Sequence, residues 1–93
     1  MRDSTLTVVR LRLVYLARLR EAFASAGEAL SLAHEAPTVS DVVGALRARG
    51  GAWADELAPG RAVRYAVNHR LARADHEVKD GDEVAIFPPV TGG

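Results

Sequence analysis

Residues 38–46, TVSDVVGAL, encode the main helix of this chain. Thr38 is predicted as the N-cap, with Asp41 at the third helical position as in a variant capping box. Gly50-Gly51 is the predicted end of the helix. Apolar side chains recur at i, i+3, i+4 and i+7 on one helix face: Val39, Val42, Val43 and Leu46. Because β-branched residues lower helix propensity, we expect packing of this face against a sheet to stabilise the helix.

Strands are predicted before the helix. Residues 8–16 alternate between apolar and polar side chains, as in a strand with one buried face. The side chains predicted to face the core are Val9, Leu11, Leu13 and Tyr15. A short helix follows, with Gly27 predicted as its C-cap. Residues 29–33 form a weaker strand candidate, and Pro37 ends it.

More short strands are predicted after the helix. Trp53 and Leu57 stand one helical turn apart in residues 52–60. Residues 64–67 and 70–72 read as strands joined by a turn at Asn68-His69, and Asp80-Gly81 gives a further turn. Residues 83–87 alternate again, with Val84 and Ile86 facing the core and Phe87 facing outward.

This order of elements predicts an α+β fold, a mixed sheet packed on one main helix. The ubiquitin-like β-grasp has this arrangement. We expect residues 1–87 to form the domain, with residues 1–7 as a loose lead-in, and residues 88–93 to form a separate C-terminal tail.

Composition excludes several classes of function. The 93 residues carry 12 basic and 12 acidic side chains, so no net field attracts nucleic acid or an anionic membrane. No apolar run approaches a membrane span, and no signal-peptide pattern follows Met1, so we expect a cytoplasmic protein. The chain has no cysteine, which excludes thiol catalysis and thiolate metal sites.

The last six residues, 88–93, have an unusual composition: two prolines near the start and two glycines at the end. Pro88 and Pro89 fix the backbone and remove two donors, so the tail is expected to run extended for roughly 18–20 Å. Val90 and Thr91 continue it, and Gly92 and Gly93 bring no Cβ atoms to the end. This pattern predicts a terminal carboxylate presented to a partner's active site. The alternative is an unstructured tail.

Side chains offer no comparable site. His34, His69 and His76 lack metal-ligand spacing, so we expect no bound metal. Asp55-Glu56 and Asp82-Glu83 are adjacent in sequence and make poor acid–base pairs, because neighbouring side chains on a strand diverge. Five acidic residues within positions 75–83 form either turns or an acidic patch beside the tail that attracts a basic partner.

Three segments resemble the small subunit of molybdopterin synthase, the MoaD-type sulfur carriers. They are Val67-Asn68, DGDEVA at 80–85 and the tail FPPVTGG at 87–93. The similarity is dense from about residue 63 to the end and looser over the first strand and the two helices that follow.

The resemblance implies a β-grasp fold and a role in molybdenum cofactor synthesis. In that family a ubiquitin-activating-like adenylyltransferase uses ATP to adenylate the terminal carboxylate, here that of Gly93. The carboxylate becomes a thiocarboxylate, and the tail, here Pro88, Pro89, Val90, Thr91, Gly92 and Gly93, enters the large subunit. There the sulfur passes to a cyclic pterin monophosphate to build the dithiolene. The carrier itself binds no cofactor and is no enzyme alone.

The resemblance also implies a heterotetramer of two small and two large subunits. Family contacts to the large subunit carry over onto Leu16, Leu71 and Phe87, although Leu16 stands where an aromatic residue is familiar. Three other readings stay open. They are a sulfur carrier for thiamine or cysteine synthesis, a ubiquitin-like modifier joined to lysines, and a plain interaction domain.

Overall fold

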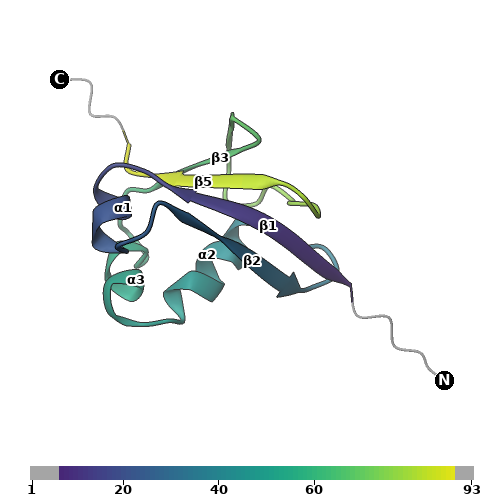
Figure 1. The fold of residues 1–93 in the computed structure, drawn as a ribbon, viewed down its shortest axis with the longest axis horizontal. Coiled ribbons are helices and arrows are strands. Elements are labelled where there is room, and N and C mark those ends of the chain that lie inside the picture. The colour runs from purple at the N-terminus through teal and green to yellow at the C-terminus, as the bar shows by residue number, and fades with distance from the viewer. Residues whose placement is uncertain (1–6, 90–93) are drawn as a thin grey trace.

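Within residues 7–89, which this computed structural model describes, the chain forms one five-stranded sheet and three helices (Figure 1). The elements in chain order are β1 (Val8–Tyr15), α1 (Arg18–Ala22), β2 (Gly27–Ala33), α2 (Val39–Arg47), α3 (Gly51–Glu56), β3 (Arg64–Val67), β4 (Arg70–Ala72) and β5 (Glu83–Phe87). The strand order is β2-β1-β5-β3-β4, with β1 and β5 parallel and the other pairs antiparallel. This is the predicted β-grasp arrangement.

The core lies between one face of the sheet and the helices. In β1, the side chains of Val9, Leu11, Leu13 and Tyr15 are all buried, which confirms the alternation predicted for this strand. Val84 and Ile86 of β5 are fully buried on the same face. Each strand therefore has an inner face toward the helices and an outer face away from them.

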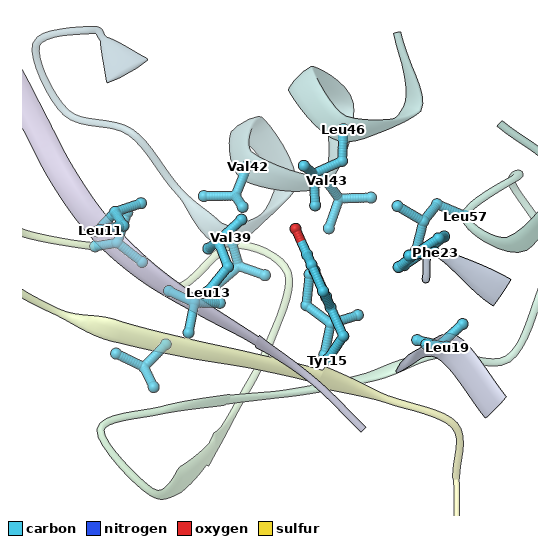
Figure 2. Packing of buried hydrophobic residues seen from close by; sticks show 14 of the residues in the cluster. Leu11, Leu13, Tyr15, Leu19, Phe23, Val39, Val42, Val43, Leu46 and Leu57 are labelled. Atoms are coloured by element: carbon cyan, nitrogen blue, oxygen red, sulfur yellow. The ribbon is translucent and has the colours of Figure 1, made fainter. Parts of the chain in front are cut away.

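Helix α2 has the predicted cap and the predicted apolar face. Thr38 N–H donates to the Asp41 carboxylate at 2.8 Å, and Asp41 N–H donates back to the Thr38 hydroxyl at 3.4 Å. These bonds lower the pKa of Asp41, the backbone N–H of Thr38 having the largest effect. Figure 2 shows Val39, Val42, Val43 and Leu46 directed at Leu13 and Tyr15 of the sheet. Packing against the sheet therefore stabilises α2 and offsets the low helix propensity of its β-branched residues.

The first helix ends earlier than predicted. Helix α1 stops at Ala22 with Phe23 as its C-cap, and Gly27 is the first residue of β2, opposite Val14. A Cβ atom at Gly27 would collide with the carbonyl oxygen of Leu13 on the neighbouring strand. The glycine is thus needed for a close approach of two strands, which a helix-period pattern does not reveal.

Three aromatic rings close the core at the α1 end of the sheet. The Phe23 and Trp53 rings stack with centroids 3.9 Å apart, and Tyr15 meets both edge-on at 5.1 and 5.5 Å. Trp53 lies on α3, so the predicted helical turn around Trp53 and Leu57 is confirmed. The rings join β1, α1 and α3 into one packed unit.

A polar network that the sequence did not predict lies beside these rings. The Tyr15 hydroxyl donates to Glu28 on β2 at 2.6 Å, and Arg49 donates two hydrogen bonds of 2.8 Å to the same carboxylate. The Arg49 guanidinium also lies 4.5 Å from the centre of the Trp53 ring. The hydrogen bonds from Arg49 lower the pKa of Glu28. Burial, and after it the hydrogen bond to Glu28, raises the pKa of Tyr15.

We expect Glu28→Gln to lower the free energy of unfolding by about 1 kcal/mol at neutral pH, because it removes a charge-assisted pair in a partly exposed position. The effect depends on pH. Since folding lowers the pKa of Glu28, its contribution is present above the unfolded value of about 4.3 and is lost as pH falls through the folded value. Urea titrations should therefore show that the free energies of unfolding of the unmodified chain and of Glu28→Gln become equal as the pH falls from neutral to acid. If the difference between them stayed the same across this range, the role given to the Glu28 carboxylate would be contradicted. Glu35→Gln on the exposed loop serves as the control.

Candidate functional site

The end of β5 leads the chain out of the domain. Phe87 is the last strand residue, and Pro88 and Pro89 follow with no regular secondary structure and partial exposure. Figure 1 shows this exit beside α1, at one end of the sheet. The predicted tail residues Val90, Thr91, Gly92 and Gly93 lie outside the described residues, so their extended course stays a prediction.

A row of small and apolar residues crosses the outer face of the sheet. Strand pairing aligns Gly27 with Val14, Val14 with Ala85, Ala85 with Ala66, and Ala66 with Leu71. We call these five residues the apolar stripe. In each strand these residues alternate with the core residues, so they share the outer face, where Ala85 is itself buried between its neighbours. The stripe spans all five strands and ends at Leu71.

The three predicted interface residues lie on this face. Leu71 is 79% exposed and Leu16 is 43% exposed, unusually high values for leucine side chains. Leu16 follows β1 and donates its N–H to the Ile86 carbonyl at 3.2 Å, which places it beside the end of β5. Phe87 pairs with Arg64 on the outer face, as the alternation predicted, but is only partly exposed. Leu16 and Phe87 thus extend the apolar stripe toward the tail.

Sequence reasoning missed most of the stripe. Ala66 and Ala85 are too small to stand out in a sequence, and Leu71 lies on a three-residue strand without a readable period. Only the pairing of β3 with β4 and β5 aligns them. Val14, an apolar residue that follows Arg10 and Arg12 on the same face of the strand, is the one local signal in the sequence.

Basic side chains surround the start of the tail. Arg18 and Arg61 both donate to one oxygen of Glu56, at 3.2 and 2.9 Å, and both are about half exposed. Their guanidinium groups lower the pKa of Glu56, with Arg18 having the larger effect. An open hollow of about 690 Å³ lies between these arginines and Pro88-Pro89. Two guanidinium groups therefore share one carboxylate beside Pro88-Pro89.

The prediction of an acidic patch beside the tail is wrong, because the acidic residues at positions 80–83 lie at the other end of β5. Asp80, Asp82 and Glu83 come before β5, whereas the tail follows it, and the four steps from Glu83 to Phe87 span about 13 Å. Asp80 accepts a hydrogen bond from Arg10 N–H at 2.7 Å. Asp82 accepts from Lys79 N–H at 2.8 Å and from the Asn68 side chain at 2.9 Å. The turn interpretation is confirmed.

The described residues bring no three histidine or acidic side chains into a group that could hold a metal ion. His34 follows β2, His69 lies in the β3–β4 turn, and His76 precedes β5. In the part of the chain that the structure covers, no helix has the length and apolar character needed to cross a membrane.

Fold and site together define a class: a ubiquitin-like β-grasp domain whose C-terminal end leaves the sheet beside an apolar surface. The chain belongs to the ThiS family, whose model matches residues 13–93. It is 39% identical to a protein of Escherichia coli named molybdopterin synthase sulfur carrier subunit, over 83 residues that cover 89% of this chain and 99% of that protein.

Solved structures agree with this membership. A putative molybdopterin converting factor, subunit 1, from Pyrococcus furiosus superimposes with a TM-score of 0.74 at 30% identity, over 88% of this chain and 99% of that one. The small archaeal modifier protein SAMP1 from Haloferax volcanii gives 0.73 at 26% identity, over 90% and 99%. The same fold is thus found in a protein named as a putative molybdopterin converting factor subunit and in a small archaeal modifier protein.

Proposed function

We propose that this chain is the sulfur-carrier small subunit of molybdopterin synthase. The observation that carries the proposal is the exit of the chain from β5, beside the apolar stripe and through Pro88-Pro89, toward a sequence that ends in Gly92-Gly93. A relative named molybdopterin synthase sulfur carrier subunit and a solved structure named as a putative molybdopterin converting factor subunit support the same role. The domain provides the binding surface, and the chain terminus provides the reacting group.

The chemistry takes place at Gly93. Its carboxylate attacks the α-phosphate of ATP on a separate adenylyltransferase, which forms an acyl-adenylate and releases pyrophosphate. A sulfide equivalent then attacks the carbonyl carbon and displaces AMP, leaving a thiocarboxylate. The unactivated carboxylate lacks a good leaving group, which the adenylate supplies. Glycines 92 and 93 leave both faces of this carbonyl open to attack.

Transfer requires the large subunit. We infer that its surface covers the apolar stripe with Leu16 and Phe87, while the tail reaches its active site and gives sulfur to a cyclic pyranopterin monophosphate. Stiff prolines reduce the conformational entropy lost when the tail enters that site. The family assembly of two small and two large subunits leaves each carrier with one such site.

Reconstitution tests this proposal directly. The thiocarboxylate form of the chain is mixed with the large subunit encoded in the same genome and with the cyclic pterin, and dithiolene formation is followed alongside the mass of the chain. We expect the dithiolene to appear as sulfur leaves the carrier. A chain that binds the large subunit and keeps its sulfur would contradict the proposed function.

We expect Leu71→Glu to weaken binding to the large subunit at least about tenfold, or 1.4 kcal/mol, because a charge would be buried in an apolar contact. Leu71 is 79% exposed in the chain by itself, so the melting temperature should change little. Val8→Glu is the matched control, since Val8 is also exposed but lies at the far end of β1 from the tail. Equal weakening by both variants, measured by calorimetry, would indicate a general charge effect.

A second candidate is a protein modifier, favoured by the likeness to SAMP1. In this case the activated Gly93 would meet a lysine amine and form an isopeptide bond. A sulfur carrier for thiamine or cysteine synthesis would instead meet a different small acceptor. Incubating the activated chain with cell extract distinguishes them, because a modifier gives covalent adducts of higher mass and a carrier returns to the free acid.

A further inference from the structure

The two edges of the sheet differ in how well they resist pairing with another chain. Strand β4 is only three residues long and begins at Arg70, with Arg73 just beyond it. Strand β2 has seven residues in unbroken register with β1, and residues 29–33 include no charge and no proline. Edge strands are usually protected by short length, charge, proline or bulges. Strand β2 has none of these over its last five residues.

The backbone of β2 also presents its hydrogen-bonding groups outward. Tyr15 N–H donates to the Ala26 carbonyl at 2.9 Å, and His34 N–H donates to the Thr7 carbonyl at 3.1 Å. Since hydrogen-bonding direction alternates along an antiparallel strand, the even-numbered residues of β2 face β1. The N–H and C=O groups of Ala29, Ser31 and Ala33 therefore point away from the sheet. Their side chains are small and exposed, so another strand can approach closely.

We propose that β2 pairs with β2 of a second copy of this chain, antiparallel and centred on Ser31, to make a continuous ten-stranded sheet. Ser31 then lies opposite its own equivalent, and Ala29 lies opposite Ala33. These three residue pairs are hydrogen-bonded pairs, in keeping with the outward direction of their backbone groups. Leu30 lies opposite Leu32 on the inner face.

Side-chain matching selects this register. Centring on Ser31 places Leu30 opposite Leu32, and it places His34 opposite the second copy's Glu28, whose carboxylate is already held by Arg49 and Tyr15 of its own chain. Moving the centre to Leu30 places Glu28 against the second copy's Leu32. Moving it to Leu32 places Leu30 against the second copy's His34. The chain also has a formal net charge of zero, so no long-range repulsion opposes its self-association.

This pairing is independent of the proposed sulfur transfer and compatible with it. The two-fold axis runs perpendicular to the sheet, so the helices of both copies lie on one face and both outer faces stay open. Figure 1 shows β2 at the edge of the sheet, with β1 between it and β5. The apolar stripe remains available on its outer face, and the chain exit is two strands away from the paired edge.

Sedimentation of the full-length chain tests the proposal between about 10 μM and about 1 mM, a range suited to a weak interface. We expect the apparent mass to rise from 9.9 kDa toward twice that value. Ser31→Lys should raise the dissociation constant at least about tenfold, because like charges would lie directly opposite each other. Ala52→Lys adds the same charge on exposed α3 and should associate like the unmodified chain.

Hydrogen exchange identifies the surface involved. We expect the amides of Ala29, Ser31 and Ala33 to become protected as the protein concentration rises, and Ser31→Lys to abolish this protection. Ala29→Lys repeats the test at a second exposed position, should Ser31→Lys alter the fold. A chain that stays monomeric throughout, or one whose association leaves these three amides unchanged, would overturn the proposal. The proposal would also be overturned if these amides became protected from exchange only when a different protein was added.

Discussion

A chain that lacks Gly93 is expected to lose all detectable sulfur transfer while its fold and its affinity for the large subunit change little. The reacting carbonyl would then belong to Gly92, one residue short of its place in both partner active sites. A displacement of one residue is about 3.3 Å, and misplacement by even 1 Å can cost about a hundredfold in rate. Adding one residue beyond Gly93 should have the same effect, because the carboxylate then overshoots.

The measurement is dithiolene formation in the reconstituted system, with binding to the large subunit measured in parallel. The same residue added before Met1 is the control, since it changes length without moving the C-terminal carboxylate. An extended chain that still builds the dithiolene at a normal rate would show that the terminus is not the sulfur donor.

Val42→Asp is expected to destabilise the fold severely. Val42 is fully buried on the face of α2 that packs on the sheet, and Figure 2 shows it above Leu13 and Val39. A carboxylate there would have to stay uncharged or lie unpaired among apolar side chains, at a cost of at least about 3–5 kcal/mol. Because a domain of this size has roughly 5–14 kcal/mol of stability in total, much of it would be lost.

Urea unfolding monitored by circular dichroism measures this effect. Ser40→Asp is the matched control, because Ser40 is exposed two positions earlier on the same helix and an acidic residue near a helix N-terminus is favourable. If Val42→Asp unfolded at the same urea concentration as the control, α2 would not pack on the sheet as described.

Local patterns in the sequence predicted the elements that have a strong period or a clear boundary. The alternation in β1 predicted both the strand and its buried face, and the N-cap and apolar face of α2 did the same for the helix. Both patterns repeat at the period of the element, so they can be recognised in the sequence. Turn residues such as Asn68-His69, both with positive φ, fixed the β3–β4 connection. These features depend on neighbours within a few positions.

Local sequence patterns did not predict the features that depend on how the strands pair. Gly27 was assigned to a helix end because its real constraint, the carbonyl of Leu13, lies on another strand. The acidic residues 80–83 are close to the tail in sequence but lie at the opposite end of β5. The apolar stripe, likewise, forms only when five strands take their register. Alternation predicted the outward direction of Phe87, whereas Leu16 and Leu71 were named as interface residues from the family resemblance.

The most direct test of the central claim is the intact mass of the chain after incubation with its adenylyltransferase, ATP and sulfide. We expect a single replacement of oxygen by sulfur at Gly93, absent without ATP and absent from the chain that lacks Gly93. A chain that remains only the free acid, with an adenylyltransferase shown to be active, would contradict the account.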